Sequence, residues 1–246
     1  MKRATFLLAA LALSACAQGP GPRRGERAPD GQRVLRGFDG EKLERTANPS
    51  ALVAEEIAFA RAAREDGQWT AFRRFAADDA VLFVPAMVDA KTWLTGRADP
   101  AEAAAWQPHR VIMSCDGRTG VTTGARQRPD GSFGYYTTVW YRPNERNGQW
   151  GWVLDHGDTL AEPLAEPDFV RTSVAECRGG VPTVTGANAR RDGYVQGLSD
   201  DRTLVWEAAV QPDGSRSVTV DLWNGEDYDR LIENRFAASS AGPVAP

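Results

Sequence analysis

The chain has 246 residues, of which 42% are hydrophobic and 25% are charged, and its formal net charge is −4 at pH 7. These fractions are ordinary for a globular protein, so the chain can bury a hydrophobic core. Its basic residues do not gather on any predicted helix or strand. The sequence therefore lacks the electrostatic footprint of a nucleic-acid-binding protein.

The amino-terminal residues are typical of a secretory leader. Lys2 and Arg3 precede an apolar run, Ala4–Leu13, that is shorter than the roughly 20 residues needed to span a bilayer. Leu13-Ser14-Ala15-Cys16 then resembles the lipobox of bacterial lipoproteins, in which cleavage leaves a lipid-modified cysteine. The alternative is ordinary cleavage after Ala17. We predict a signal peptide over 1–15, a lipid anchor at Cys16 and a place on the periplasmic side of the cell envelope, where Ala17 favours the outer over the inner membrane.

Residues 16–47 are predicted to form a flexible tether, because this Pro- and Gly-containing stretch shows no apolar periodicity. Two cysteines remain beyond it, Cys115 and Cys177. An oxidising compartment would allow them to form a disulfide that stabilises the fold by about 4 kcal/mol. Two buried thiols that never meet are the alternative, since the sequence does not give their separation.

A first helix is predicted from Asn48-Pro49 to Gly67, with Asn48 as its cap and Pro49 at the first helical position. Its apolar stripe consists of Leu52, Val53, Ile57, Phe59, Ala60 and Ala63. Glu56 falls in the middle of that stripe. It is either a pocket group or a residue at the stripe edge whose carboxylate reaches water.

Short elements follow the first helix. The sequence predicts a helix over 69–75, a strand over 80–84 that Pro85 breaks, and a helix over 89–94. Asp99-Pro100, with Glu102 in the acidic third position, predicts one more brief helix that runs through Ala105.

Strands dominate the rest of the chain. Runs over 106–115 and 119–127 lead into the strongest hairpin signal, 130–141 paired with 149–156, where aromatic and β-branched residues flank a turn with Pro, Asn and Gly. We predict an α+β fold with an antiparallel sheet packed on one side by the helices. A second hairpin, 204–210 with 217–223, surrounds the Gln211–Gly214 turn, and Tyr194-Val195 is a candidate third strand.

Several catalytic and cofactor motifs are absent. The sequence has no Gly-x-Ser-x-Gly elbow, phosphate loop or dinucleotide glycine motif, and it has only two histidines, so we predict no metal and no cofactor. The acidic run Glu226–Asp229 does not match a calcium loop and is interpreted as a solvated helix start.

Acid–base chemistry remains open, with Glu56, His109, Asp155 and His156 as candidates. Alternation along the strand over 149–156 places Trp150, Trp152, Leu154 and His156 on one face, and Asp155 on the other. A bulge would reverse that assignment.

Ordered motifs between Pro49 and Gly157 resemble the SnoaL-like branch of the nuclear-transport-factor-two-like superfamily. They are Phe59-Ala-Arg-Ala-Ala-Arg-Glu-Asp-Gly67, Ala71-Phe72, Ala77-Asp-Asp-Ala-Val-Leu82, Pro85, Trp106-Gln-Pro108 and Trp150-Gly-Trp-Val-Leu-Asp155. The resemblance implies a curved sheet wrapped around helices into a cone-shaped barrel with a pocket at its open end. The sequence matches none of the family's catalytic motifs residue by residue.

On this basis the cone domain covers 48–160, a C-terminal β extension covers 161–236, and 237–246 is a disordered tail. Candidate pocket residues are Phe59, Trp106, Trp140 and Trp152, with a core role as the alternative. We predict a non-catalytic, lipid-anchored periplasmic protein that binds a small apolar ligand or an envelope partner. A lyase or isomerase using acid–base catalysis in the cone is one alternative. A homodimeric structural module that pairs through its open sheet face, with aromatic residues of the strand over 135–140 exposed, is the other.

Overall fold

A computed structural model describes residues 47–84, 86–143, 148–178, 180–184 and 188–238. The predicted signal peptide, Cys16, the tether up to residue 46 and the tail from residue 239 lie outside the described residues. In the described part, no helix has the length and apolar character needed to cross a membrane.

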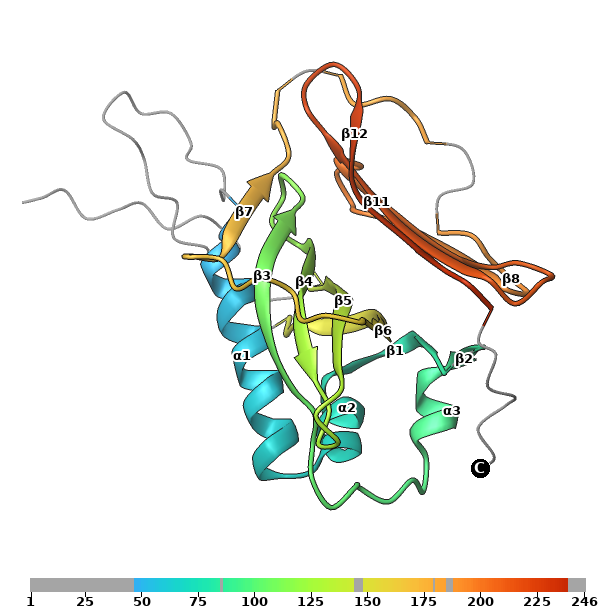
Figure 1. The fold of residues 1–246 in the computed structure, drawn as a ribbon. Coiled ribbons are helices and arrows are strands. Elements are labelled where there is room, and N and C mark those ends of the chain that lie inside the picture. Colours follow the sequence, from blue (N-terminus) through green and yellow to red (C-terminus); the bar gives the residue numbers. More distant parts are fainter. Residues whose placement is uncertain (1–46, 85, 144–147, 179, 185–187, 239–246) are drawn as a thin grey trace, which may run out of the picture. The chain divides into compact units, whose positions relative to one another are not determined.

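Three helices and a seven-stranded mixed sheet form the first half of the described chain (Figure 1). The helices are α1 (Pro49–Glu65), α2 (Gln68–Phe75) and α3 (Ala90–Leu94). The strands are β1 (Ala76–Phe83), β2 (Met87–Asp89), β3 (Ala105–Met113), β4 (Thr119–Gln127), β5 (Phe133–Tyr141), β6 (Gly151–Thr159) and β7 (Arg171–Val174), in the order β2-β1-β6-β5-β4-β3-β7.

The sheet has an antiparallel centre with a parallel pair on each side. Strands β3 to β6 pair consecutively and antiparallel, as predicted, whereas β1 pairs with β6 and β7 pairs with β3 in parallel. Pro108 fits inside β3 because the register shifts between Pro108 and Arg110, and proline is tolerated at such a bulge.

The helices cover one face of this sheet with an aromatic core. Phe59 of α1 lies 5.7 Å from Trp140 of β5, centroid to centroid, and 4.8 Å from Phe72 of α2. Trp152 of β6 belongs to the same buried cluster. Asn48 caps α1 by accepting a hydrogen bond from the Ala51 amide at 3.3 Å, as its sequence position predicts.

A second, antiparallel sheet of five strands follows in the order β12-β11-β10-β9-β8 (Figure 1). Its strands are β8 (Arg190–Arg191), β9 (Tyr194–Leu198), β10 (Leu204–Val210), β11 (Arg216–Trp223) and β12 (Tyr228–Phe236). Its apolar face shares a buried cluster with Val81, Ile112, Val139 and Leu154 of the first sheet. The prediction for Glu226–Asp229 is wrong, because this run turns into β12 instead of starting a helix.

The second sheet covers the face of β5 that was predicted to pair two copies of the chain. The Tyr135 ring stacks on Phe236 with centroids 5.8 Å apart, and the Thr137 hydroxyl lies 3.2 Å from the Asn234 side-chain oxygen, to which it donates a hydrogen bond. A homodimer would therefore have to use another surface.

A disulfide and two facing turns also join the two sheets. Cys115 and Cys177 are bonded, with Cα atoms 5.3 Å apart. Beside them, Asp201 accepts a hydrogen bond from the Asp116 amide at 2.6 Å, and Asp116 accepts one from the Asp201 amide at 3.3 Å. The Cys115 amide donates to the Thr203 hydroxyl at 2.9 Å. These bonds connect the β3–β4 turn to the β9–β10 turn.

The helix predicted to start at Asp99 does not form. The Asp99 carboxylate instead accepts hydrogen bonds from the Trp69 and Thr70 amides at 2.5 and 2.9 Å, and from the Thr70 hydroxyl at 2.6 Å. It thus caps α2, whose own N-cap residue, Gly67, has no side chain to do so. The capping residue was recognised correctly, but it serves a different helix.

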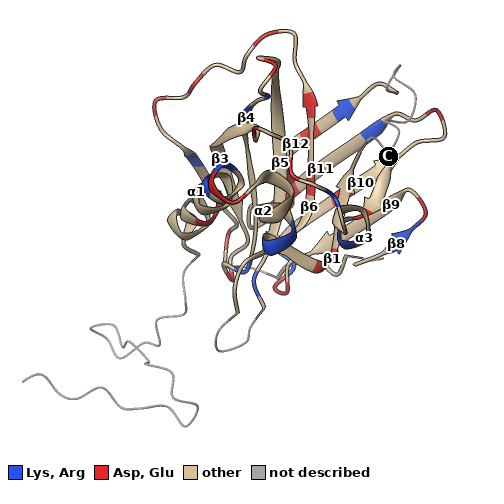
Figure 2. Ribbon diagram, turned by 90° about the horizontal axis from the view of Figure 1, so that it is seen from below, with Lys and Arg blue, Asp and Glu red and all other residues tan. Residues whose placement is uncertain are grey.

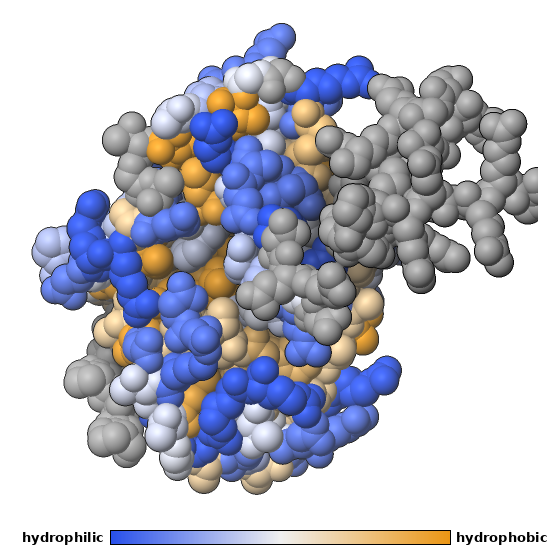
Figure 3. Space-filling model, turned by 180° about the vertical axis from the view of Figure 1, so that it is seen from behind, coloured by the Kyte–Doolittle hydropathy of each residue, from blue (hydrophilic) through white to orange (hydrophobic). Residues whose placement is uncertain are grey.

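The observed architecture confirms the predicted α+β class with a curved sheet and few helices. The described chain contains more strands than the predicted cone and hairpin. Basic and acidic residues are interspersed along the elements (Figure 2). On the face seen in Figure 3, hydrophobic side chains lie in separate areas between hydrophilic ones.

Candidate active site

A cavity of about 580 Å³ is lined by α2, α3, the segment between α3 and β3, the first sheet and Arg216 of the second sheet. Its size suits a small organic molecule. Its aromatic wall contains Trp69, Phe72, Trp93 and Trp106, and the Trp69 and Trp93 rings meet edge to face at 5.2 Å. Its charged and polar lining includes Gln68, Arg97, Glu102, Arg126, Arg128, Tyr136, Asp155, His156, Asp158 and Arg216.

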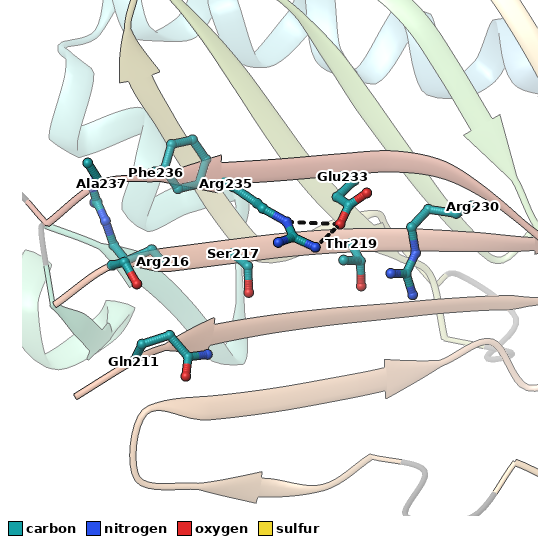
Figure 4. A pocket seen from close by; sticks show the side chains of 10 residues that line it. Gln211, Arg216, Ser217, Thr219, Arg230, Glu233, Arg235, Phe236 and Ala237 are labelled. Atoms are coloured by element: carbon teal, nitrogen blue, oxygen red, sulfur yellow. Dashed lines mark hydrogen bonds and ion pairs between the residues drawn. The ribbon is translucent and has the colours of Figure 1, made fainter. Parts of the chain in front are cut away.

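A groove of about 570 Å³ on β11 and β12 differs from this cavity in character (Figure 4). Its polar side chains extend from the second sheet. Most of its charges are paired within that sheet, whereas Arg216 lies 3.8 Å from Asp158 of β6. Glu233 accepts hydrogen bonds from Arg235, and Arg230 pairs with Asp221 at 2.8 Å. The groove offers no buried carboxyl group, so we place the candidate chemistry in the first cavity.

Asp155 reaches that cavity because of a bulge in β6. Val139 pairs with Leu154, but Trp140 pairs with Trp152, so Val153 is an extra residue that interrupts the alternation of faces. Trp152 therefore faces the helices, while Leu154 and His156 face the second sheet. The prediction that Trp152, Leu154 and His156 share a face is wrong for this reason.

The Asp155 carboxylate is held by one neutral donor. Thr138, opposite it on β5, donates a hydrogen bond from its hydroxyl at 2.7 Å. Burial raises the pKa of Asp155 from 3.8 to about 6, and the Thr138 hydrogen bond and the charge of Arg126 only partly oppose that rise. At neutral pH Asp155 is mostly ionised and a stronger base than an ordinary aspartate.

Glu56 is fully buried behind the cavity wall and accepts hydrogen bonds from three side chains. The Trp106 indole donates at 2.6 Å, the Thr122 hydroxyl at 2.5 Å and the Trp140 indole at 3.1 Å. Burial is the main cause that raises the pKa of Glu56 from 4.5 to about 7, and the charge of Asp155 raises it further. The carboxyl group therefore does not reach water, as the stripe-edge interpretation requires, but Glu56 is not among the residues that line the cavity either.

Tyr136 lies near both carboxyl groups, since the charges of Glu56 and Asp155 both act on its hydroxyl. Its side chain is 4% exposed, lines the cavity, and has its hydroxyl beside Thr122. Burial and the charges of Glu56 and Asp155 raise the pKa of Tyr136 well above its usual value, so its hydroxyl stays protonated and able to donate.

The two histidines do not join this group as acids or bases. His156 borders the cavity but packs against Phe83, Tyr135 and Phe236, and burial lowers its pKa to about 3, which leaves it neutral. His109 lies on β3 near Glu166, apart from the cavity lining, and burial lowers its pKa too. The structure thus brings Glu56 and Asp155 together without His109.

Of the four predicted pocket residues, only Trp106 lines the cavity. Phe59, Trp140 and Trp152 are almost completely buried in the core between the helices and the sheet. Their role is the core alternative stated above, because their rings fill the space that an empty cone would leave.

Sequence reasoning missed Tyr136, Thr138 and Arg126. The period of two along each strand was the available signal, since Thr122, Gly124 and Arg126 alternate on β4, as do Tyr136, Thr138 and Trp140 on β5. Nothing in the sequence showed that these two faces were the ones turned to the cavity. Within the described residues, no group of three or more His, Cys, Asp or Glu side chains is arranged to hold a metal ion.

Comparisons with known proteins add little to this geometry. No protein-family model matches the chain, and no curated protein matches it. A candidate ketosteroid isomerase from Parabacteroides distasonis is similar at 15% identity with a TM-score of 0.35, over 53% of this chain and 98% of that one. The CaMKII hub of S. rosetta is similar at 20% identity with a TM-score of 0.33, over 46% of this chain and 96% of that one. At these levels, the resemblance to the SnoaL-like branch stays a prediction.

Proposed function

We propose that the cavity is the active site of a lyase or isomerase in which Asp155 moves a proton to and from carbon. The observation that carries this proposal is an ionisable carboxylate, whose pKa burial raises to about 6, in a cavity that has an aromatic wall. A general base is most effective when its pKa lies near the working pH, and such groups contribute roughly 10²- to 10⁴-fold to a rate.

Each neighbouring group has a definite part in such a reaction. Asp155 removes a proton from a carbon next to a carbonyl, and the electron pair moves onto the carbonyl oxygen. The Tyr136 hydroxyl stays protonated, and its buried oxygen is the donor that would stabilise that charge once a substrate oxygen reaches it. In an isomerase Asp155 then returns the proton to another carbon. In a lyase the electron pair instead expels a leaving group, and the proton stays on Asp155 until water removes it.

Non-catalytic binding of a small apolar molecule remains a second candidate, favoured by the wall of Trp69, Phe72, Trp93 and Trp106. Binding of this kind needs the aromatic wall alone and makes no use of the ionisation of Asp155. The two candidates therefore differ in what they predict for a variant without that carboxylate.

The deciding experiment follows proton transfer by NMR in D₂O. Cyclohexanone, 4-oxocyclohexanecarboxylate and 3-cyclohexen-1-one would be incubated with wild-type protein, Asp155→Asn and the control Asp79→Asn, which changes an exposed carboxylate on β1. We expect deuterium incorporation or double-bond migration with wild type and control, rising as the pH passes about 6, and a loss of at least about 100-fold in Asp155→Asn. Binding without exchange in all three proteins would favour the non-catalytic candidate.

We also propose that the protein is anchored by a lipid on Cys16 at the periplasmic side of the cell envelope, with the outer membrane as the favoured site. The lipobox-like sequence around Cys16 and the Cys115–Cys177 disulfide support this location, since disulfides persist in oxidising compartments. Cys16→Ser should move the protein from the membrane fraction to the soluble periplasm. Unchanged fractionation would refute the anchor.

A further inference from the structure

Arg126 lines the cavity, and two glycines of the neighbouring strands lie next to its guanidinium. The residue pairs with Gly134 on β5, and its guanidinium extends toward Gly157 on β6. A Cβ atom at Gly157 would come within 3.2 Å of Nη1, and one at Gly134 within 3.6 Å of Nη2. The guanidinium thus lies against the backbone at both glycines, and a side chain at Gly157 would crowd it.

The carboxylates closest to Arg126 are engaged by other groups. Asp155 accepts its hydrogen bond from Thr138, and Asp158 accepts one from the Thr159 amide at 2.7 Å and lies 3.8 Å from the Arg216 guanidinium. The Nε of Arg126 is buried and has no hydrogen-bond partner among the described residues. A buried donor without a partner is costly, so the fold bears a cost to hold this guanidinium beside the cavity.

The other arginines that line the same cavity are already committed. Arg97 lies over the Trp93 ring at 3.6 Å, and Arg128 donates a hydrogen bond to the Thr159 hydroxyl at 2.7 Å. Arg216 lies beside Asp158 and also stacks over Phe236 at 5.3 Å. Arg126 is therefore the cation of this cavity whose fork is best placed to receive a ligand.

We propose that the cavity selects small apolar molecules that carry one carboxylate, and that Arg126 binds this carboxylate. This inference rests on the proposed function and deepens it by naming the substrate class. A planar carboxylate matches the guanidinium fork in a bidentate pair. Asp155 and Asp158 face the same space and repel a doubly charged group, which disfavours a phosphate. The aromatic wall receives the apolar body.

Binding can be tested without any knowledge of the reaction, because Trp69, Trp93 and Trp106 line the cavity and their fluorescence reports occupancy. The probes are cyclohexanecarboxylate, the neutral cyclohexanecarboxamide of the same shape, and inorganic phosphate. They would be titrated into wild-type protein, Arg126→Met, Arg126→Lys and the control Arg235→Met, which changes an arginine on the outer face of β12.

We expect wild type and Arg235→Met to bind the carboxylate at least about tenfold more tightly than the carboxamide, since hydrogen bonds between charged groups are the strong ones. Arg126→Met should lose that preference while keeping its affinity for the carboxamide, and Arg126→Lys should retain part of it. Equal binding of the two probes by wild type, an unchanged preference in Arg126→Met, or phosphate competing as well as the carboxylate would overturn the proposal. If a variant does not fold, the comparison of carboxylate and carboxamide affinity in the wild-type protein still tests the proposal.

The carboxylate-binding test and the proton-exchange test can fail independently of each other. A carboxylate preference that depends on Arg126, without proton exchange in any ketone, would refute the reaction and leave the binding site. Exchange in cyclohexanone with no preference for either carboxylate would refute the binding site and leave the reaction.

Discussion

Glu56 offers a direct test of the polar network behind the cavity. Its carboxyl group is fully buried and accepts hydrogen bonds from Trp106, Thr122 and Trp140. Glu56→Gln keeps the size and shape of the side chain and removes its ability to ionise. The variant changes the hydrogen bonds by an amount that hardly depends on pH, so any pH-dependent difference from wild type reports the buried charge.

The expected magnitude follows from the pKa. The pKa of Glu56 rises from 4.5 to about 7, which corresponds to about 3 to 4 kcal/mol because one pKa unit is about 1.4 kcal/mol. The folded protein binds this proton more tightly than the unfolded chain does. Glu56 therefore contributes stability that is fully present below pH 4.5 and is lost as the pH rises through about 7. The buried carboxylate of Asp155 acts in the same direction, and neutral His156 acts in the opposite one.

The assay is urea unfolding of wild type and Glu56→Gln at about pH 5 and pH 8, followed by far-UV circular dichroism. Asp155 and His156 contribute nearly equally to both proteins, so most of their contribution cancels in the difference between the two free energies of unfolding. We expect the free energy of unfolding of the variant, relative to that of wild type, to be about 2 to 3 kcal/mol higher at pH 8 than at pH 5, because wild type is destabilised by the buried charge at pH 8. Glu65→Gln, which changes an exposed carboxylate on the same helix, should show the same difference at both pH values. Parallel pH curves for wild type and Glu56→Gln would refute the buried-charge reasoning.

Three further predictions concern parts of the fold outside this network. Asp99→Ala should lower the free energy of unfolding by about 1 kcal/mol or more, because α2 loses its cap; an unchanged urea midpoint would contradict this. Reduction of the Cys115–Cys177 disulfide, whose cysteines lie 62 residues apart, should lower it by about 4 kcal/mol, measured by urea unfolding with and without dithiothreitol. The His156 ring protons should keep constant NMR shifts from pH 8 to pH 5, since its pKa is about 3; a midpoint near 6.5 would show that the ring is exposed.

Local chemistry predicted much of the first half of the fold. Asn48 and Pro49 identify the start of α1. The apolar stripe around Phe59 predicts the helix face that packs on the sheet, except that Ile57 of that stripe is 47% exposed. The aromatic and β-branched runs predict β5 and β6 as partners. These signals can be recognised in the sequence because a helix cap, an apolar helix stripe and the alternation of a strand each depend on residues that are close together in the chain.

The remaining features depend on contacts between distant residues. Asp99 has the sequence of a local helix cap, yet the amides it binds belong to Trp69 and Thr70 about thirty positions earlier. The second sheet is built from strands whose alternation was visible over 204–223. Its place on the face of β5 depends on contacts such as Tyr135 with Phe236, which no local pattern encodes.

The candidate chemistry depends on one extra residue in β6. Without the bulge at Val153, alternation from Trp152 would turn His156 toward the helices and Asp155 toward the second sheet, away from Tyr136 and Glu56. With it, Asp155 lies opposite Thr138, and His156 becomes a neutral ring among aromatic residues. Strand registers shift by one residue without any change in composition. The sequence could therefore identify the four ionisable candidates, whereas the choice of Asp155 as the base required the pairing of β5 with β6.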